Sequence, residues 1–206
     1  MDFTVADRKK GEDARKQPMK YPGRAVWYLV LVVVLVAPGC SSHGVYPVEW
    51  GDLSPASGDS CPSLAGVFQN AGERAVPEGG SPQYSPPYLS SYFFADTAAA
   101  ARANRVRITG DANKELTVEL LGEDASLEPR ILQRQAHYRC EDGWLLLESS
   151  RWIAENVSGF ESMTYRFRKT HEGAMVVQVS SSAVGVVFVV PVAGSSTEWH
   201  RFLLAE

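Results

Sequence analysis

The chain has 206 residues, of which 45% are apolar and 21% charged, with a formal net charge of −4 and three cysteines. This length predicts one domain or two, and the composition excludes a disordered or fibrous chain. Three cysteines are too few for a disulfide-dense mini-protein. The negative charge argues against a protein that coats nucleic acid, because phosphate binding needs clustered Lys and Arg side chains.

An uncharged apolar segment, AVWYLVLVVVLVA, occupies residues 25–37. Its thirteen residues fall short of the ~20 that a membrane-spanning helix needs and match the apolar core of a secretion signal. Lys16, Lys20 and Arg24 supply the positive flank before it. Translation is predicted to begin at Met19, because a compact signal follows that residue. Two alternatives stay open: an uncleaved signal-anchor helix and a buried core helix.

Ala37-Pro38-Gly39-Cys40 follows the apolar segment, so small residues precede a cysteine. The first 42 residues resemble the signal of bacterial lipoproteins of the Gram-negative type, although a larger aliphatic residue is usual where Ala37 stands and Pro38 is uncommon. The resemblance implies that residues 1–39 are a signal peptide cut after Gly39. Cys40 then becomes the first residue and carries the fatty acyl chains, palmitate among them.

Ser41 rather than an aspartate follows Cys40, which by the same resemblance implies the outer membrane, with the protein facing the periplasm. Residues 40–60 are rich in Ser, Gly, Pro and Asp and are predicted to be a flexible tether to a globular domain at 61–206. Trp50 is the exception, predicted either to dock on the domain or to lie at the membrane surface.

From Cys40 onward the chain carries 13 Lys and Arg residues against 20 Asp and Glu residues. This acidic balance argues against nucleic acid or anionic headgroups as the main partner. Cys61 and Cys140 remain as a pair once Cys40 is acylated, and export places them in an oxidising compartment. A disulfide between them is therefore predicted, with two separate buried thiols as the alternative.

Short runs of β-branched and aromatic residues, separated by turn residues, predict about eight or nine strands at a spacing near ten residues. This spacing leaves no room for helical crossovers, so the sheet is predicted to be antiparallel. The predicted fold is mainly β, an antiparallel meander closed into a small barrel, with a two-sheet sandwich as the alternative. The predicted strands are 64–70, 105–109, 115–121, 130–140, 144–152, 162–170, 175–181, 183–192 and 197–204.

A short helical insertion is predicted at about 86–103, in two pieces, the second capped by Asp96. Residues 183–192, AVGVVFVVPV, would be apolar on both faces of a strand, and this predicts a strand that is buried on both sides. The helical piece at 86–94 is predicted to cover the outer face of this strand, with a partner protein as the alternative cover.

The sequence contains no HExxH, CxxC, GxSxG, SxxK or phosphate-loop pattern. No catalytic residue, metal site or cofactor is therefore predicted. The predicted function is a non-enzymatic lipoprotein of the cell envelope with a structural or binding role. Its predicted partners are the membrane, through Cys40, and either an envelope protein or an apolar ligand.

Two other functions stay open. Leu64, Gly66, Phe68 and Asn70 form a Leu-x-Gly-x-aromatic-x-Asn pattern that resembles the first strand of small exported β-domains, some of them lipocalin-like. This resemblance implies a carrier of an apolar ligand. In a strand Leu64 and Phe68 point to the same face, and they are predicted to face the core. The other function is an envelope enzyme, whose site would gather His137, His200 and acidic residues.

Overall fold

The computed structural model describes residues 40–55, 60–75, 85–122, 127–154, 158–187 and 190–205. All of these residues belong to one unit of the chain, residues 38–206. The predicted signal peptide lies outside the described residues, with Met19 and Gly39.

The larger of two sheets has seven strands in the order β1-β11-β10-β9-β8-β7, and β3 also pairs with β11. Neighbouring strands from β7 to β11 are antiparallel, whereas the short β1 runs parallel to β11. The strands are β1 (Cys40–His43), β3 (Glu73–Arg74), β7 (Arg139–Glu141), β8 (Trp144–Ala154), β9 (Ser158–Lys169), β10 (Met175–Val187) and β11 (Val190–Phe202).

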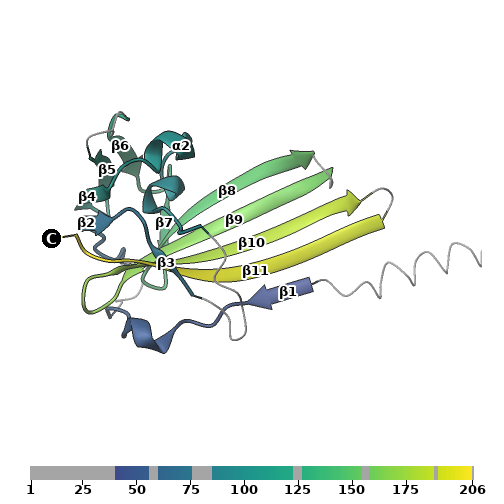
Figure 1. The fold of residues 1–206 in the computed structure, drawn as a ribbon, viewed down its shortest axis with the longest axis horizontal. Coiled ribbons are helices and arrows are strands. Elements are labelled where there is room, and N and C mark those ends of the chain that lie inside the picture. Colours follow the sequence, from purple (N-terminus) through teal and green to yellow (C-terminus); the bar gives the residue numbers. More distant parts are fainter. Residues whose placement is uncertain are drawn as a thin grey trace, which may run out of the picture. The chain divides into compact units, whose positions relative to one another are not determined.

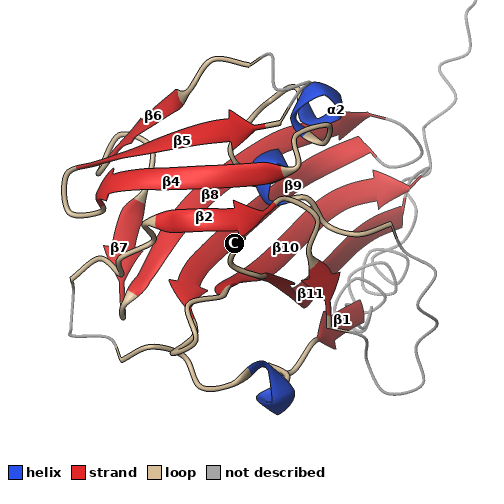
Figure 2. Ribbon diagram, turned by 60° about the vertical axis from the view of Figure 1, so that its left-hand side comes forward, coloured by secondary structure: helices blue, strands red, loops and turns tan. Residues whose placement is uncertain are grey.

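The smaller sheet has four antiparallel strands in the order β2-β4-β5-β6. The smaller sheet lies against one end of the larger sheet (Figures 1 and 2). The short helices lie in the segments that connect the strands. These elements are β2 (Gly66–Gln69), β4 (Arg105–Asp111), β5 (Glu115–Leu121), β6 (Arg130–Gln133), the 3-10 helices η1 (Val48–Trp50) and η2 (Leu89–Tyr92), and the helix α2 (Thr97–Ala100).

Alternation of apolar and polar residues explains how the smaller sheet forms. In β5, Leu116, Val118 and Leu120 are buried, and the residues between them are more exposed. On the outer face Arg107 lies directly opposite Glu119, and their side chains form an ion pair of 2.8 Å. One face of this sheet is thus apolar and must be covered.

One hydrophobic core fills the space between the two sheets. Side chains from both sheets belong to it, so the sheets pack face to face. Leu64 and Phe68 are fully buried in this core, as predicted. Its largest fully buried side chains are Leu64, Phe68, Leu89, Phe93, Ile108, Leu116, Leu132, Leu145, Phe167, Met175 and Phe202.

The prediction of a small barrel is wrong, although the fold is mainly β as predicted. The strands form two separate sheets, and at the C-terminal end they meet through an isolated bridge between Phe68 and Leu204. Strands β8 to β11 have 11 to 13 residues, whereas the strands of the smaller sheet have four to seven. The long strands therefore extend beyond the smaller sheet instead of closing with it (Figure 1).

The prediction for residues 183–192 is also wrong. These residues are the end of β10 and the start of β11, not one strand, because Val187 pairs with Val190. Val184 and Val186 are 67% and 43% exposed, so no helix among the described residues covers them. The helix that was expected to do so, η2, packs instead in the core between the sheets, where Leu89 is fully buried.

Two further predictions concern the helices and the tether. Asp96 caps α2, its carboxylate accepting a hydrogen bond from the Ala99 N–H at 2.9 Å, as predicted. Residues 40–60 are predicted to be a flexible tether, but the described part of this segment is folded onto the domain, since β1 pairs with β11 and Trp50 is 5% exposed. Trp50 docks on the domain against Val176 and Trp199.

Candidate functional site

Cys40, the predicted lipidation site, begins β1 at the edge of the larger sheet. In the register of the sheet, Cys40 lies opposite Gly194 of β11, and Gly194 lies opposite Ala183 of β10. Because β1 is parallel to β11, which runs from Val190 toward the core, Cys40 is the outermost residue of its strand. We call residues 150–154, 158–162, 182–187 and 190–195 the outer ends of β8 to β11.

The outer ends extend beyond the smaller sheet and lack its cover (Figures 1 and 2). Trp152, Phe160, Val184 and Ala193 pair directly with one another across the four long strands. Directly opposed residues point to the same face of a sheet, so these four, the apolar row, form one apolar strip. Trp152, Phe160 and Val184 are 67%, 49% and 67% exposed.

A row of serines lies two residues further inward on the same face. Ser150, Ser162, Ser182, Ser195 and Ser41 pair in that order across five strands. These are the serine row. Three of these serines line a hollow of about 300 Å³ where β1, β10 and β11 meet. Its lining residues are Ser41, Ser182 and Ser195, with Ala183, Val184, Ala193 and Gly194.

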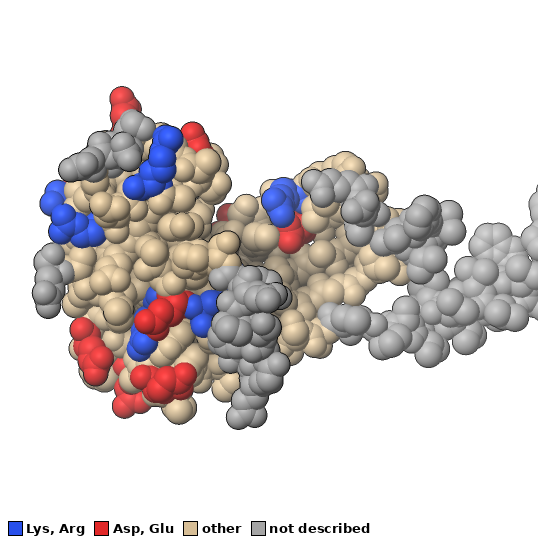
Figure 3. Space-filling model, in the orientation of Figure 1, with Lys and Arg blue, Asp and Glu red and all other residues tan. Residues whose placement is uncertain are grey.

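The outer ends carry little charge. Among their described residues, only Arg151 and Glu161 are charged, and these form an ion pair of 2.7 Å. In the view of Figure 3 the visible surface of this region is mostly uncharged, whereas charged side chains are scattered over the end of the domain that carries the smaller sheet. The outer ends thus combine exposed apolar side chains with no net charge.

His200, which the alternative of an envelope enzyme would place in the catalytic site, lies in a buried polar cluster with Tyr92, Glu198 and Arg74. The imidazole is 5% exposed in β11, and its Nδ1 is hydrogen-bonded to the Tyr92 hydroxyl. Its Nε2 lies 3.3 Å from Glu198, and Arg74 contacts the same carboxylate oxygen at 3.4 Å. Burial, followed by the nearby Arg74 guanidinium, lowers the pKa of His200 to about 4, although Glu198 acts in the opposite direction. His200 is therefore neutral near pH 7.

His137 does not join this cluster. It lies in the turn between β6 and β7, where its Nδ1 accepts a hydrogen bond from the Gln133 N–H at 3.0 Å. The two histidines thus belong to different parts of the fold. Tyr92 beside His200 is buried, which raises the pKa of its hydroxyl. A catalytic site made from both histidines finds no support in this geometry.

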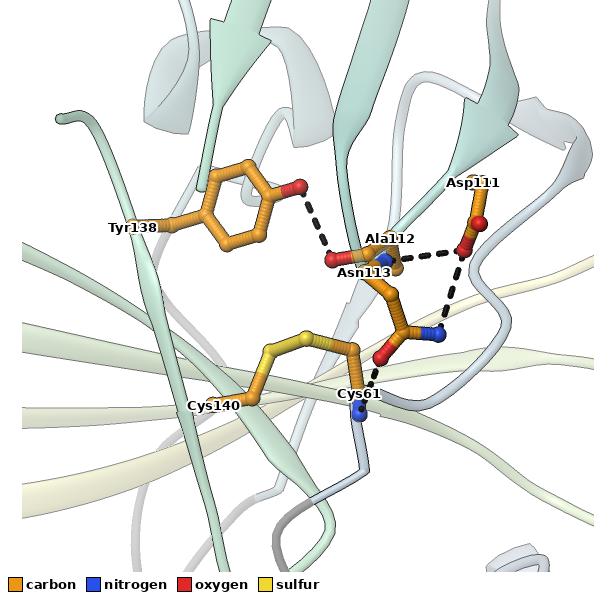
Figure 4. Close-up of a disulfide and its surroundings, with 6 residues drawn as sticks. All are labelled: Cys61, Asp111, Ala112, Asn113, Tyr138 and Cys140. Atoms are coloured by element: carbon orange, nitrogen blue, oxygen red, sulfur yellow. Dashed lines mark hydrogen bonds between the residues drawn. A yellow bond between two sulfur atoms is a disulfide. The ribbon is translucent and has the colours of Figure 1, made fainter. Parts of the chain in front are cut away.

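The structure contains the predicted disulfide between Cys61 and Cys140, with their Cα atoms 5.1 Å apart (Figure 4). Cys61 precedes β2 and Cys140 lies in β7, so the bond joins the segment that leads into the smaller sheet to the edge of the larger one. The Cys61 N–H also donates to Asn113 Oδ1 at 3.3 Å.

Two further observations bear on membranes and metals. In the part of the chain that the structure describes, no helix has the length and apolar character to span a bilayer. Nor do three or more His, Cys, Asp or Glu side chains gather into a metal-binding group within the described ranges.

Comparisons with protein-family models, with curated proteins and with solved structures found no match for this chain. The residues themselves therefore carry the functional interpretation. The sequence pointed to Cys40, but it did not point to the apolar row. The sequence signal for part of the row is that Trp152 and Phe160 lie eight residues apart, on either side of a short segment that is rich in turn and polar residues, as opposed residues of a hairpin do.

Proposed function

We propose that this protein is a lipoprotein of the bacterial cell envelope, held at the outer membrane by fatty acyl chains on Cys40. Its β-domain, in this proposal, faces the periplasm and has a structural or binding role rather than a catalytic one. Acyl chains contribute about 0.8 kcal/mol per buried methylene, so several chains on one residue hold a protein on a membrane permanently.

The observation that carries the proposal is the place of Cys40 in the chain. An apolar segment with a positive flank and three small residues come before it, and the first strand of the folded part begins at it. An anchor at this residue therefore meets the sheet directly, with no long linker. The disulfide between Cys61 and Cys140 supports export to an oxidising compartment.

Metabolic labelling with radioactive palmitate tests the proposal. The wild-type protein, expressed in a Gram-negative host, should take up the label and fractionate with the outer membrane. The Cys40→Ala variant should take up none. A Cys61→Ala/Cys140→Ala double variant is the matched control, because it removes two cysteines and should keep the label. Equal labelling of wild type and Cys40→Ala contradicts the proposal.

The hollow beside Cys40 favours a second candidate function, carriage of an apolar ligand. Its volume of about 300 Å³ lies at the lower end of the range for small-molecule sites. Mass spectrometry of the detergent-extracted protein should then find a bound apolar molecule that Ala193→Phe, which fills the hollow, removes. If wild type and Ala193→Phe carry the same molecules, the hollow is not a carrier site.

A further inference from the structure

We propose that the apolar row, with Val186 beyond it, lies in the interface of a zwitterionic lipid bilayer. The outer ends of β8 to β11 are then a second membrane contact beside the anchor, and they fix the orientation of the domain on the membrane. This inference rests on the proposed attachment at Cys40.

The first support is the chemistry of the row. Trp152, Phe160 and Val184 are adjacent across three strands, point to one face and are about half exposed or more. Val186 lies one step further out on the same face and is 43% exposed. An exposed row of this kind on long strands promotes aggregation unless something covers it. Trp and Phe are the side chains that insert most readily at a membrane interface.

The second support is the level of Cys40 in the sheet. Cys40, Gly194, Ala183, Glu161 and Arg151 are paired in succession across the sheet. The apolar row is only one residue further out, which is about 3.3 Å along a strand. An acyl group that enters the bilayer from Cys40 therefore brings the apolar row to the same surface.

The third support is the change in polarity along the strands. The serine row lies two residues inward from the apolar row, and the next row contains Glu148 and Thr164, which are opposite each other. Each step of two residues is about 6.6 Å, close to the depth of about 5–10 Å to which interfacial segments enter a bilayer. The apolar row would then lie among the upper acyl chains and the serine row among the headgroups.

Charge points to the kind of lipid. The two charged residues at the described outer ends, Arg151 and Glu161, neutralise each other as an ion pair. The contact therefore depends on apolar insertion rather than on anionic headgroups, whose attraction is screened by salt. Zwitterionic phosphatidylcholine should suffice, and salt should have little effect.

Quenching of tryptophan fluorescence by brominated lipid tests the inference. The full chain is expressed in a Gram-negative host, extracted in detergent and reconstituted into phosphatidylcholine vesicles with bromine atoms near the upper end of the acyl chains. Wild type is compared with Trp152→Phe and with the matched control Trp144→Phe, which alters the other end of the same strand. Trp27 belongs to the predicted signal peptide, so the processed chain that the proposal predicts does not contain it.

The inference predicts that Trp152→Phe loses most of the lipid-quenchable fluorescence and that Trp144→Phe keeps it, at low and high salt alike. A Phe160→Ser/Val184→Ser variant keeps Trp152 as the probe and should show weaker quenching. The variants of the apolar row should retain the disulfide and the wild-type melting temperature, because the altered side chains are exposed. Equal quenching in wild type and Trp152→Phe overturns the inference.

Palmitate labelling of the same preparations separates the two proposals. Label on Cys40 without quenching of Trp152 overturns the inference and leaves the lipoprotein proposal in place. Quenching of Trp152 without label supports the bilayer contact and overturns attachment through acyl chains. Protection of Trp152 from lipid together with a dimer in light scattering assigns the row to a second copy of the chain and overturns the bilayer contact.

Discussion

Gly44 donates its backbone N–H to the Thr197 carbonyl oxygen at 2.8 Å and so fixes the end of β1 to β11. A side chain at Gly44 has no room, because a Cβ there would lie 2.8 Å from the same oxygen. The Trp199 indole N–H also donates to the Gly44 carbonyl at 3.0 Å. The residues next to the proposed anchor are thus held on the sheet.

Gly44→Pro should release β1 from the sheet, because proline removes the N–H donor and places a ring against the Thr197 oxygen. We expect palmitate labelling at Cys40 to persist, proteolytic cleavage of residues 41–46 to increase and lipid quenching of Trp152 to fall. Val45→Ala is the control, since Val45 is 83% exposed and its side chain is dispensable. Unchanged proteolysis in Gly44→Pro would mean that β1 does not depend on this hydrogen bond.

Asn70 should be one of the most sensitive positions for stability. Its fully buried side chain donates to the Ala100 and Ala103 carbonyls at 3.1 and 2.8 Å, and it accepts from the Ser90 N–H at 2.9 Å. Asn70→Ala removes all three hydrogen bonds, although the Ala100 carbonyl keeps the Ser90 hydroxyl as a donor, and it should lower the free energy of unfolding by about 3 kcal/mol. Urea unfolding checks this.

The exposed Asn104 supplies the control for that measurement. Asn104→Ala should change the free energy of unfolding by less than about 0.5 kcal/mol, as expected for surface positions. If Asn70→Ala and Asn104→Ala prove equally stable, the buried hydrogen bonds of Asn70 do not hold the helical insertion on β2.

The disulfide should contribute strongly to stability, because Cys61 and Cys140 are 79 residues apart in sequence. A loop of this length predicts a loss of about 2–4.5 kcal/mol on reduction. Urea unfolding with and without dithiothreitol measures the loss. A Cys61→Ser/Cys140→Ser variant should resemble the reduced wild type and not respond to the reductant. A wild-type protein that is indifferent to dithiothreitol would show that the bond is not formed.

His200 should make stability depend on pH between about 4, its lowered pKa in the fold, and 6.5, its ordinary pKa. In that window the unfolded chain binds a proton at His200 that the buried imidazole does not bind. The free energy of unfolding therefore has its full contribution from neutral His200 above pH 6.5, and it decreases by about 2–3 kcal/mol as the pH falls toward 4. His200→Gln should lose this part of the pH dependence, whereas exposed His43→Gln should keep it.

Local patterns in the sequence predicted much of the fold. The alternation of β5 and the Asp142-Gly143 turn required only neighbouring residues, and both Asp142 and Gly143 have the positive φ that the hairpin needs. The C-terminal strands were predicted with wrong ends, at 175–181, 183–192 and 197–204, because serine and glycine, as at Ser182 and Gly194–Ser196, are typical of turns. In the structure these residues lie inside β10 and β11.

The candidate site depended on the sheet register, which the sequence did not reveal. Cys40 was predicted from its neighbours in the chain. Trp152, Phe160 and Val184 come from three strands, and they form one row only when β9 pairs with both β8 and β10 in the observed register. A shift by one residue would send each side chain to the other face.

The mass of the intact protein extracted from the outer membrane tests the central claim most directly. The lipoprotein proposal predicts a chain that begins at Cys40 and is heavier than residues 40–206 by a diacylglycerol group and an amide-linked acyl chain. Fragmentation should assign the whole excess to Cys40. A chain that retains residues 1–39 and has an unmodified thiol at Cys40 would contradict it.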